Sequence, residues 1–189
     1  MQHGASKLGP TELLSQDHRT IERLLASLEE AARRLQRGER VRAGFFLDAA
    51  GFISGFADAC HHGKEEGALF PALEAVGFPR SAGPIAVMLH EHDEGRLYTA
   101  AMRAAAQKLA SGDASAAGAV VENAQGYAGL LRQHIMKEDN VLFQMAQRAL
   151  DPDTQQKLLQ DFERIEHEHA GHESYLALVD ALERELQQR

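Results

Sequence analysis

Cysteine is almost absent from this sequence, which has one, Cys60, among 189 residues. A single thiol cannot form a disulfide within the chain, and it cannot supply the several thiolates of a structural zinc site. Composition therefore excludes both an internal disulfide framework and a cysteine-rich metal cluster. Low cysteine use agrees with a reducing compartment, so we expect a cytoplasmic protein.

Positive charge and long hydrophobic runs are also scarce. The 20 Lys and Arg residues are outnumbered by 28 Asp and Glu residues, which gives a net charge of −8. Phosphate binding needs clustered basic side chains, so we expect no nucleic-acid partner. No segment approaches the ~20 apolar residues of a membrane span, and residues 1–10 lack the apolar core of a signal peptide. We therefore expect no membrane partner.

The alternating pattern of β-strands is missing too, and apolar residues instead recur at steps of three and four. Glycine and proline separate these stretches. The pattern predicts helices at about 11–38, 41–75, 84–110, 114–149 and 153–188. Long helices with short turns favour an all-α fold. We expect a single domain (1–189): an antiparallel up-down four-helix bundle over 11–150, capped by an additional C-terminal helix at 153–188.

Histidine, in contrast, is plentiful: there are ten, and several replace apolar residues on the predicted helix faces. The motif H-x-x-K-E-x-x-x-L-F occurs twice, with His61 four residues before Glu65 and His134 four residues before Glu138. Residues i and i+4 are neighbours on one face of a helix. Each copy of the motif therefore directs one imidazole and one carboxylate to the same side.

The register of the first copy is ambiguous, because the segment reads H-H-G-K-E-E. Both His61 with Glu65 and His62 with Glu66 have the i,i+4 spacing. Only the first pair keeps the five-residue step from glutamate to phenylalanine that the second copy shows. We therefore choose His61 and Glu65, and treat His62 and Glu66 as neighbours.

Two further histidines extend the repeat. His18 and His92 each follow an acidic residue and lie 43 and 42 residues before the histidines of the two motif copies. The same alignment selects His92 rather than His90. The repeat predicts two helical hairpins that together direct one ligand-bearing face from each of four helices into the bundle centre.

These converging side chains predict a metal site. A lone histidine on an apolar face is more often a hydrogen-bonded core residue, but two facing buried glutamates would repel unless a cation lay between them. Four imidazoles and two carboxylates are more ligands than one tetrahedral zinc ion binds. They suit two ions bridged by both carboxylates. This ligand set favours iron, with manganese or zinc as substitutes. The predicted ligands are His18, His61, Glu65, His92, His134 and Glu138.

The order H … H-x-x-x-E … H … H-x-x-x-E resembles the hemerythrin-like (HHE cation-binding) family over about residues 11–150. The resemblance implies a four-helix bundle around an oxo- or hydroxo-bridged di-iron centre, with each glutamate bridging both irons. It also implies that His18 and His61 are terminal ligands on one side, and His92 and His134 on the other.

The sequence departs from the oxygen-carrying members that it resembles. Those use a His-x-x-x-His pair and a terminal aspartate, whereas this chain has Arg96 and Glu138 at these positions. The ligand set is closer to di-iron proteins linked to iron–sulfur cluster repair and nitrosative stress. Those usually carry an extra cysteine-bearing N-terminal domain, which this sequence lacks.

The resemblance implies a di-iron centre that reacts with or senses O2, NO or H2O2, with peroxide scavenging under oxidative or nitrosative stress as one form. The alternatives are non-catalytic iron binding, storage or delivery, reversible O2 binding, and a metal that only holds the helices together. The sequence leaves open whether there is turnover, which electron donor serves the irons, and the oligomeric state.

Three more side chains are candidates near the site. His169 and His172 lie on the apolar face of the predicted fifth helix, where either could act as an extra ligand or hydrogen-bond near the metal. The alternative is a core or interface histidine. Tyr127 lies two turns before His134 on the same face and is either core packing or an outer neighbour of the site. Cys60 is expected to act as a small apolar residue.

Overall fold

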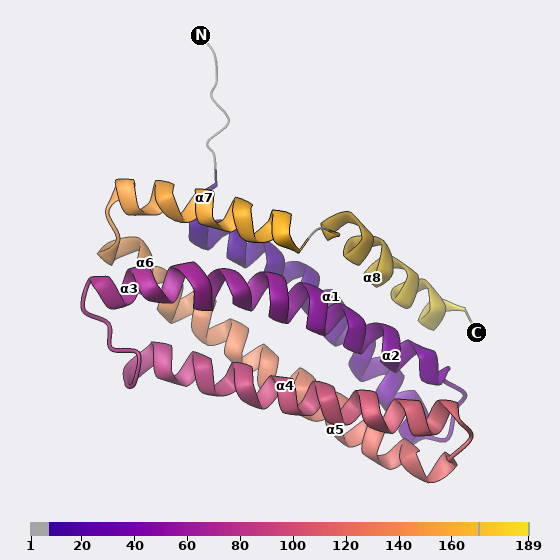
Figure 1. Cartoon of the computed structure of the whole chain (residues 1–189). Helices are drawn as coiled ribbons and strands as arrows, with labels where there is room; N and C mark the ends of the chain where they lie inside the picture. The colour runs from indigo at the N-terminus through magenta and orange to yellow at the C-terminus, as the bar shows by residue number, and fades with distance from the viewer. Residues whose placement is uncertain (1–7, 170, 189) are drawn as a thin grey trace.

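The protein is an all-helical bundle, as expected. The computed structural model describes residues 8–169 and 171–188, and all regular structure in this part of the chain is helical. Figure 1 shows the long helical segments lying alongside one another, with α7 and α8 against one side. The elements are α1 (Pro10–Gln36), α2 (Ala43–Phe52), η1 (Ile53–His62), η2 (Glu65–Leu69), α3 (Phe70–Ala75), α4 (Gly83–Ala110), η3 (Ala114–Ala116), α5 (Ala117–Lys137), η4 (Glu138–Leu142), α6 (Phe143–Ala149), α7 (Pro152–Glu168) and α8 (His172–Gln187).

Proline and glycine end the helices where the sequence predicts. Pro10 begins α1, and Pro84 lies in the first turn of α4, where its missing N–H costs nothing. Gly38 follows α1 with φ +77°, a left-handed conformation that glycine adopts without steric cost. The predicted boundaries of the first four helical segments therefore agree with the structure to within about two residues.

Two of the long helical segments contain π-helical turns, which the sequence analysis did not predict. The segment 43–75 remains helical throughout but passes through η1 and η2, and the segment 117–149 passes through η4. π-Helical turns are rare, cost hydrogen-bond geometry, and are frequent at functional sites. η2 and η4 lie within the two motif copies, and η1 ends at the two histidines that begin the first copy.

Two apolar clusters form the core, and they lie on either side of a polar layer. One contains Leu25, Phe46, Met102 and Val120, and the other contains Leu69, Met88, Phe143 and Phe162. The closest helix pairs are α4 with α5, α1 with α5, and α2 with α4. The apolar stripes of these helices meet in the interior and leave the histidines between the two clusters.

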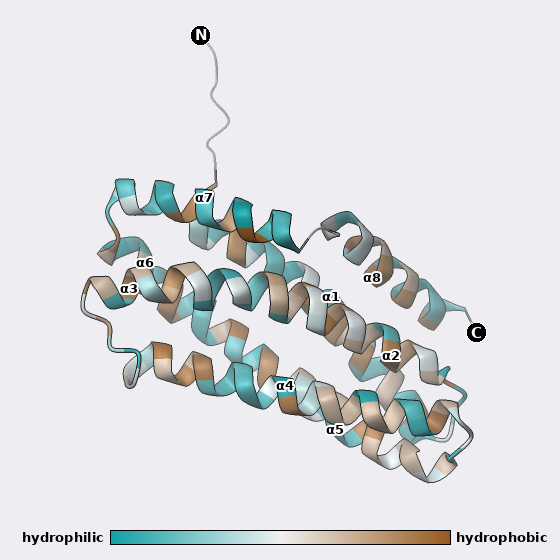
Figure 2. Cartoon of the chain, in the orientation of Figure 1, coloured by the Kyte–Doolittle hydropathy of each residue, from teal (hydrophilic) through white to brown (hydrophobic). Residues whose placement is uncertain are grey.

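The C-terminal region corrects one prediction. A single fifth helix was expected over 153–188, but the structure has α7 and α8 with a break at Gly171. Gly171 has φ +145°, which is accessible to glycine and strained for other residues. The break lets α7 pack on α1 and η2 while α8 packs on α1 and α2. In Figure 2 α7 is largely hydrophilic, and its buried apolar residues are Leu158, Phe162 and Ile165.

The helix over Ala43–Ala75 is long and apolar enough to cross a membrane by length and composition alone. Half of its most apolar window is buried inside the protein. The segment also contributes Phe46, Phe52 and Phe70 to the core, each with no exposed surface. We therefore describe it as a core helix of the bundle, since core helices meet the same compositional test.

Candidate metal centre

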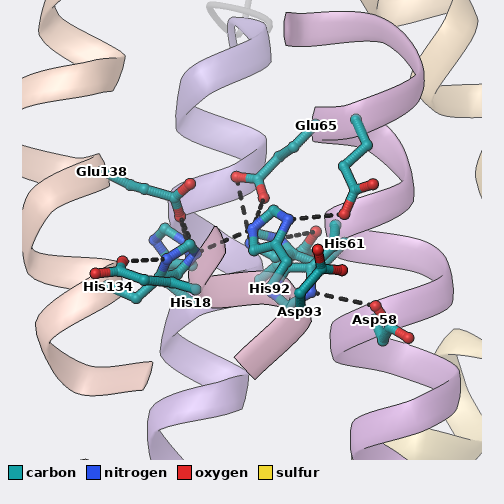
Figure 3. Close-up of polar contacts among 12 residues, drawn as sticks. His18, Asp58, His61, Glu65, His92, Asp93, His134 and Glu138 are labelled. Atoms are coloured by element: carbon teal, nitrogen blue, oxygen red, sulfur yellow. Dashed lines mark hydrogen bonds and ion pairs between the residues drawn. The ribbon is translucent and has the colours of Figure 1, made fainter. Parts of the chain in front are cut away.

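The structure brings all six predicted ligands together in the polar layer (Figure 3). Glu65 and Glu138 have no exposed surface, and the four imidazoles are at most 2% exposed. Each comes from a separate element, and the glutamates are the first residues of their π-helical turns. The positions are His18 on α1, His61 on η1, Glu65 on η2, His92 on α4, His134 on α5 and Glu138 on η4.

Glu138 lies between two imidazoles. Its Oε2 is 3.2 Å from Nε2 of His18 and 3.3 Å from Nε2 of His134. These two histidines come from helices that are far apart in sequence, and they approach the same carboxylate oxygen. A carboxylate in this position can reach two cations at once.

Glu65 occupies the corresponding position on the other side. Its Oε1 is 3.6 Å from Nε2 of His61, and its Oε2 is 3.4 Å from Nε2 of His92. Nε2 of His92 is also 3.2 Å from Nε2 of His134. Each glutamate therefore contacts one imidazole from each half of the repeat, which is the arrangement that a bridging ligand requires.

The outer nitrogen of each imidazole, Nδ1, is paired with a carboxylate. We call these four residues the supporting carboxylates. Such partners fix the orientation and tautomer of metal-binding histidines in proteins. The pairs are Asp139 with His18 at 3.0 Å, Asp17 with His61 at 3.4 Å, Glu66 with His92 at 2.8 Å, and Glu91 with His134 at 3.0 Å.

The supporting carboxylates explain the acid–histidine pairs that begin each repeat. Asp17 precedes His18 in sequence but supports His61, and Glu91 in the same way supports His134 rather than its neighbour. We name residues 17–70 the first half-site and residues 91–143 the second. In both, the acid on one helix of a hairpin holds the histidine of the next.

The lysine and phenylalanine of the motif also have matching roles. Lys64 donates to Asp17 at 2.9 Å, and Lys137 donates to Glu91. Phe70 stacks on His92, and Phe143 stacks on His18, with ring centroids 6.0 and 5.4 Å apart. Every lettered position of H-x-x-K-E-x-x-x-L-F except the leucine thus contacts the site or its supporting carboxylates.

The polar layer is strongly coupled electrostatically. Burial would lower the pKa of His18, but its hydrogen bonds to Asp139 and Glu138 raise the pKa to about 9. Burial would also lower the pKa of His134. The charge of Glu138 and the hydrogen bonds from His134 to Glu138 and Glu91 instead raise the pKa of His134 to about 10. Burial opposes ionisation of Glu138, yet the two imidazoles hold the pKa of its carboxyl well below the usual range. Without metal, protons would occupy positions that cations can take.

A separate observation also indicates that these residues suit a bound metal pair. Both carboxylate oxygens of Glu65 and Oε1 of Glu138 are buried without a hydrogen-bond partner among the described residues. A buried carboxylate oxygen without a donor is costly, and a coordinated cation removes that cost. Nitrogen and oxygen ligands without sulfur suit iron, manganese or zinc. Glu65 belongs to two groups of possible metal ligands, and within each group the ligand atoms all lie within 4.8 Å of one another.

The structure corrects the interpretation of His62 as a neighbour of the site. The residue is only 5% exposed, and its ring stacks on that of His92 with centroids 3.8 Å apart. Its Nδ1 is 3.4 Å from a carboxylate oxygen of Asp58. Burial and the neighbouring His92 lower the pKa of His62 well below its usual range. The repeat selects His61 alone. The adjacent pair His61-His62 is the sequence feature that could have indicated His62 as a second candidate.

Arg96 lies beside His62 and is held by three carboxylates. Its guanidinium donates to Asp58 at 2.8 Å, to Glu66 at 2.6 Å and to Asp93 at 2.9 Å. Two of these acceptors also pair with imidazoles of the polar layer. Arg96 therefore neutralises and positions the acids that hold His62 and His92.

A cavity of about 290 Å³ lies between η1 and α4 and reaches the polar layer. Its lining includes His62, His92, Arg96 and Tyr127, and it extends to the exposed residue Gln107. The Tyr127 hydroxyl is buried and has no hydrogen-bond partner among the described residues. Burial raises the pKa of Tyr127, so the phenol stays protonated. Tyr127 is thus both a core residue and part of the cavity wall.

The remaining candidates are further from this arrangement. His169 is exposed at the C-terminal end of α7 and is absent from the groups of possible ligands in the described structure. The side chain of His172 lies outside the described residues. Cys60 is buried without a disulfide, and burial raises the pKa of its thiol to about 11. The thiol therefore stays protonated at neutral pH, which is consistent with the expectation that Cys60 acts as a small apolar residue.

Comparison with known proteins agrees with this arrangement. The model of the hemerythrin HHE cation-binding domain matches residues 9–146. Uncharacterized proteins of Mycobacterium tuberculosis and Mycobacterium bovis are 27% identical over 169 residues, which is 89% of this chain. The chain spans 66% of the length of these relatives. No solved structure matches the chain.

Proposed function

The chain belongs to the hemerythrin HHE cation-binding family, and from this premise we propose that it is a non-haem di-iron protein whose metal pair reacts with or senses O2, NO or H2O2. The observation that carries the proposal is the pair of buried glutamates, with three carboxylate oxygens lacking hydrogen-bond partners among the described residues, between four inward-facing imidazoles. When bound, two irons supply the electrons that a small oxidant accepts.

The proposed ligand assignment follows the contacts. His18 and His61 would hold one ion, and His92 and His134 would hold the other. Glu65 and Glu138 would be shared by both ions, since each contacts imidazoles of both half-sites. In this assignment α1, α4 and the segments 43–75 and 114–149 form an antiparallel up-down four-helix bundle, with α7 and α8 against its side.

The protein residues prepare the site in three ways. The supporting carboxylates accept a hydrogen bond from Nδ1 of each imidazole and so direct the Nε2 lone pair inward. Lys64 and Lys137 hold two of these acids in place. The apolar clusters on both sides of the polar layer exclude water, which strengthens every electrostatic contact inside.

The cavity between η1 and α4 is a route by which a diatomic gas or a peroxide reaches the polar layer. Such a route favours a site that exchanges small molecules over one in which the metal only holds the helices together. The reducing cytoplasm is the proposed location, because the single thiol, Cys60, is buried and unpaired.

Metal analysis with an optical spectrum tests this function. The protein is loaded with Fe2+ without oxygen, desalted, and measured before and after addition of H2O2. We expect two irons per chain and charge-transfer bands near the ultraviolet edge that change with peroxide. The matched variants are Glu138→Gln, which should abolish both, and Glu122→Gln, an exposed carboxylate of the same long helical segment, which should change neither. Iron below one ion per chain in the unmodified protein would refute the proposal.

A further inference from the structure

We propose that His62 is a fifth imidazole ligand of the metal centre, bound to the same ion as His92 and His134, so that the two metal positions are unequal. This inference rests on the proposed metal pair and extends it. One ion then has two imidazoles, from His18 and His61, and the other has three.

The first argument is position. Ligand atoms of His62, Glu65, His92 and His134 all lie within 4.8 Å of one another, and all four side chains are buried. The ring of His62 lies 12° from parallel to that of His92 at a centroid distance of 3.8 Å. It also meets His134 edge-on at 5.7 Å. His62 is therefore part of the polar layer, on the side where the second ion is proposed.

The second argument is orientation. His62 has the same outer contact as the other four imidazoles, because its Nδ1 pairs with the carboxylate of Asp58. A carboxylate only accepts, so Nδ1 donates and the Nε2 lone pair is left on the opposite edge of the ring. Nε2 of His62 is buried and has no hydrogen-bond partner among the described residues. A metal ion supplies the partner that this buried lone pair lacks.

The third argument is the support given to Asp58. Arg96 donates to Asp58 and also to Glu66, the acid that supports His92. One guanidinium thus fixes the carboxylates behind two stacked imidazoles. This makes Arg96 a positioning residue for the His62 and His92 pair, since it contacts neither ring nitrogen that faces the centre.

The fourth argument is that the scaffold does not require these residues. In the second half-site, the positions that correspond to His62 and Asp58 are Ile135 and Leu131, both buried apolar residues. The equivalent place in the fold is therefore filled well by hydrocarbon. A buried imidazole with its own carboxylate at only one of two equivalent places points to a ligand rather than to packing.

Paramagnetic NMR on the cobalt-loaded protein counts the bound imidazoles directly. Each imidazole that coordinates Co2+ and donates through Nδ1 gives a hyperfine-shifted N–H proton that disappears in D2O. We expect five such signals in the full chain and four in His62→Ala. His90→Ala, an exposed histidine on α4, should retain all five. His62→Gln, which keeps a polar side chain, provides the same count if the alanine variant does not fold.

The outcomes separate this inference from the proposed function. Four signals in the unmodified protein, unchanged in either His62 variant, would show that His62 is not a ligand while the metal pair stands. No shifted signals and no cobalt binding would overturn the metal pair itself, and the inference with it. Five signals of which one is lost in both His62 variants would support both.

Discussion

The two half-sites share one set of contacts and differ in what surrounds it. In both, an acid of one helix supports the histidine of the next, a lysine holds that acid, and a phenylalanine stacks on an imidazole of the other half. The repeated residues therefore form the proposed metal site. The residues that differ between the halves would make its two metal positions unequal.

Burial is the first difference. Lys64 is 1% exposed because α7 covers it and Glu166 accepts its second hydrogen bond, whereas the side chain of Lys137 is 34% exposed. The second difference is at two aligned positions, where the first half has His62 and Asp58 and the second half has the apolar residues Ile135 and Leu131. The first half-site is thus deeper and carries an additional imidazole.

The largest effect should come from removing either shared carboxylate. Glu65→Ala and Glu138→Ala should each reduce bound iron from two ions per chain to none, because each glutamate contacts imidazoles on both sides. Metal analysis after loading and desalting measures this. Retention of one ion by either variant would show that the substituted carboxylate serves a single metal. The two half-sites would then not share both glutamates.

The next effect should distinguish the buried acid from its counterpart. Asp17→Asn leaves the buried Lys64 ammonium with Glu166 as its remaining charged partner, and we expect a loss of about 2 kcal/mol in the free energy of unfolding of the metal-free protein. Glu91→Gln should cost about 1 kcal/mol or less, because Lys137 reaches solvent. Urea unfolding of both variants at pH 7 measures the difference. Equal losses would show that cover by α7 does not matter.

The pH dependence of the Asp17→Asn effect has a definite sign. Burial raises the pKa of Asp17, but His61 and Lys64 lower it from 3.8 to about 2. A lowered pKa contributes stability that is present above the unfolded value and is lost as pH falls through the folded value. The difference between the native protein and Asp17→Asn should therefore shrink between about pH 4 and pH 2. A difference that stays constant would contradict the role of ionised Asp17.

A smaller effect on metal affinity should appear at Asp58 and His62, which have no counterparts in the second half-site. Asp58→Asn removes the charge that supports His62, and loss of such an outer partner weakens metal affinity roughly 10–100-fold. Only one of two steps in a Co2+ titration should weaken, since the change lies beside one ion. Asp93→Asn is the matched control, because Asp93 also bonds Arg96 but supports no imidazole. Equal weakening of both steps would remove the asymmetry between the halves.

The smallest effect should come from the break between α7 and α8. Gly171→Ala places a side chain at φ +145°, which costs about 1 kcal/mol or somewhat more. The melting temperature of the metal-free protein should fall by a few degrees. Because α7 packs on α1 and η2 and covers Lys64, whereas Lys137 is partly exposed, the hydrogen-exchange rate should rise around Lys64 and remain unchanged around Lys137. A uniform rise would mean that α7 stabilises the whole bundle.

Much of this molecule could be predicted from local signals. Pro10, Gly38 and Pro84 mark helix ends by backbone chemistry, and the i,i+4 spacing places His134 with Glu138 on one face. The repeat identified six residues that the fold brings together. These features depend on residues close in sequence, or on one pattern that occurs twice.

The rest depends on contacts between distant residues. Which acid supports which imidazole follows from helix packing, so Asp17 with His61 could not be derived from the Asp-His pair. In the second motif copy no residue pattern predicts a π-helical turn. In the first copy the π-helical turn allows both His61 and His62 to face inward, which a regular α-helix would not. Gly171 lies in an otherwise helical pattern, and a single glycine there does not by itself predict a break, because helices tolerate isolated glycines.

The supporting carboxylates join the helices in a closed circuit. Asp17 links α1 to η1, Glu66 links η2 to α4, Glu91 links α4 to α5, and Asp139 links η4 back to α1. No helix can leave with its ligand unless two of these links break. Release of a metal ion from the proposed site should therefore be coupled to cooperative opening of the bundle. Its lifetime in the site should be governed by the rate of that opening and not by the lability of any one metal–ligand bond.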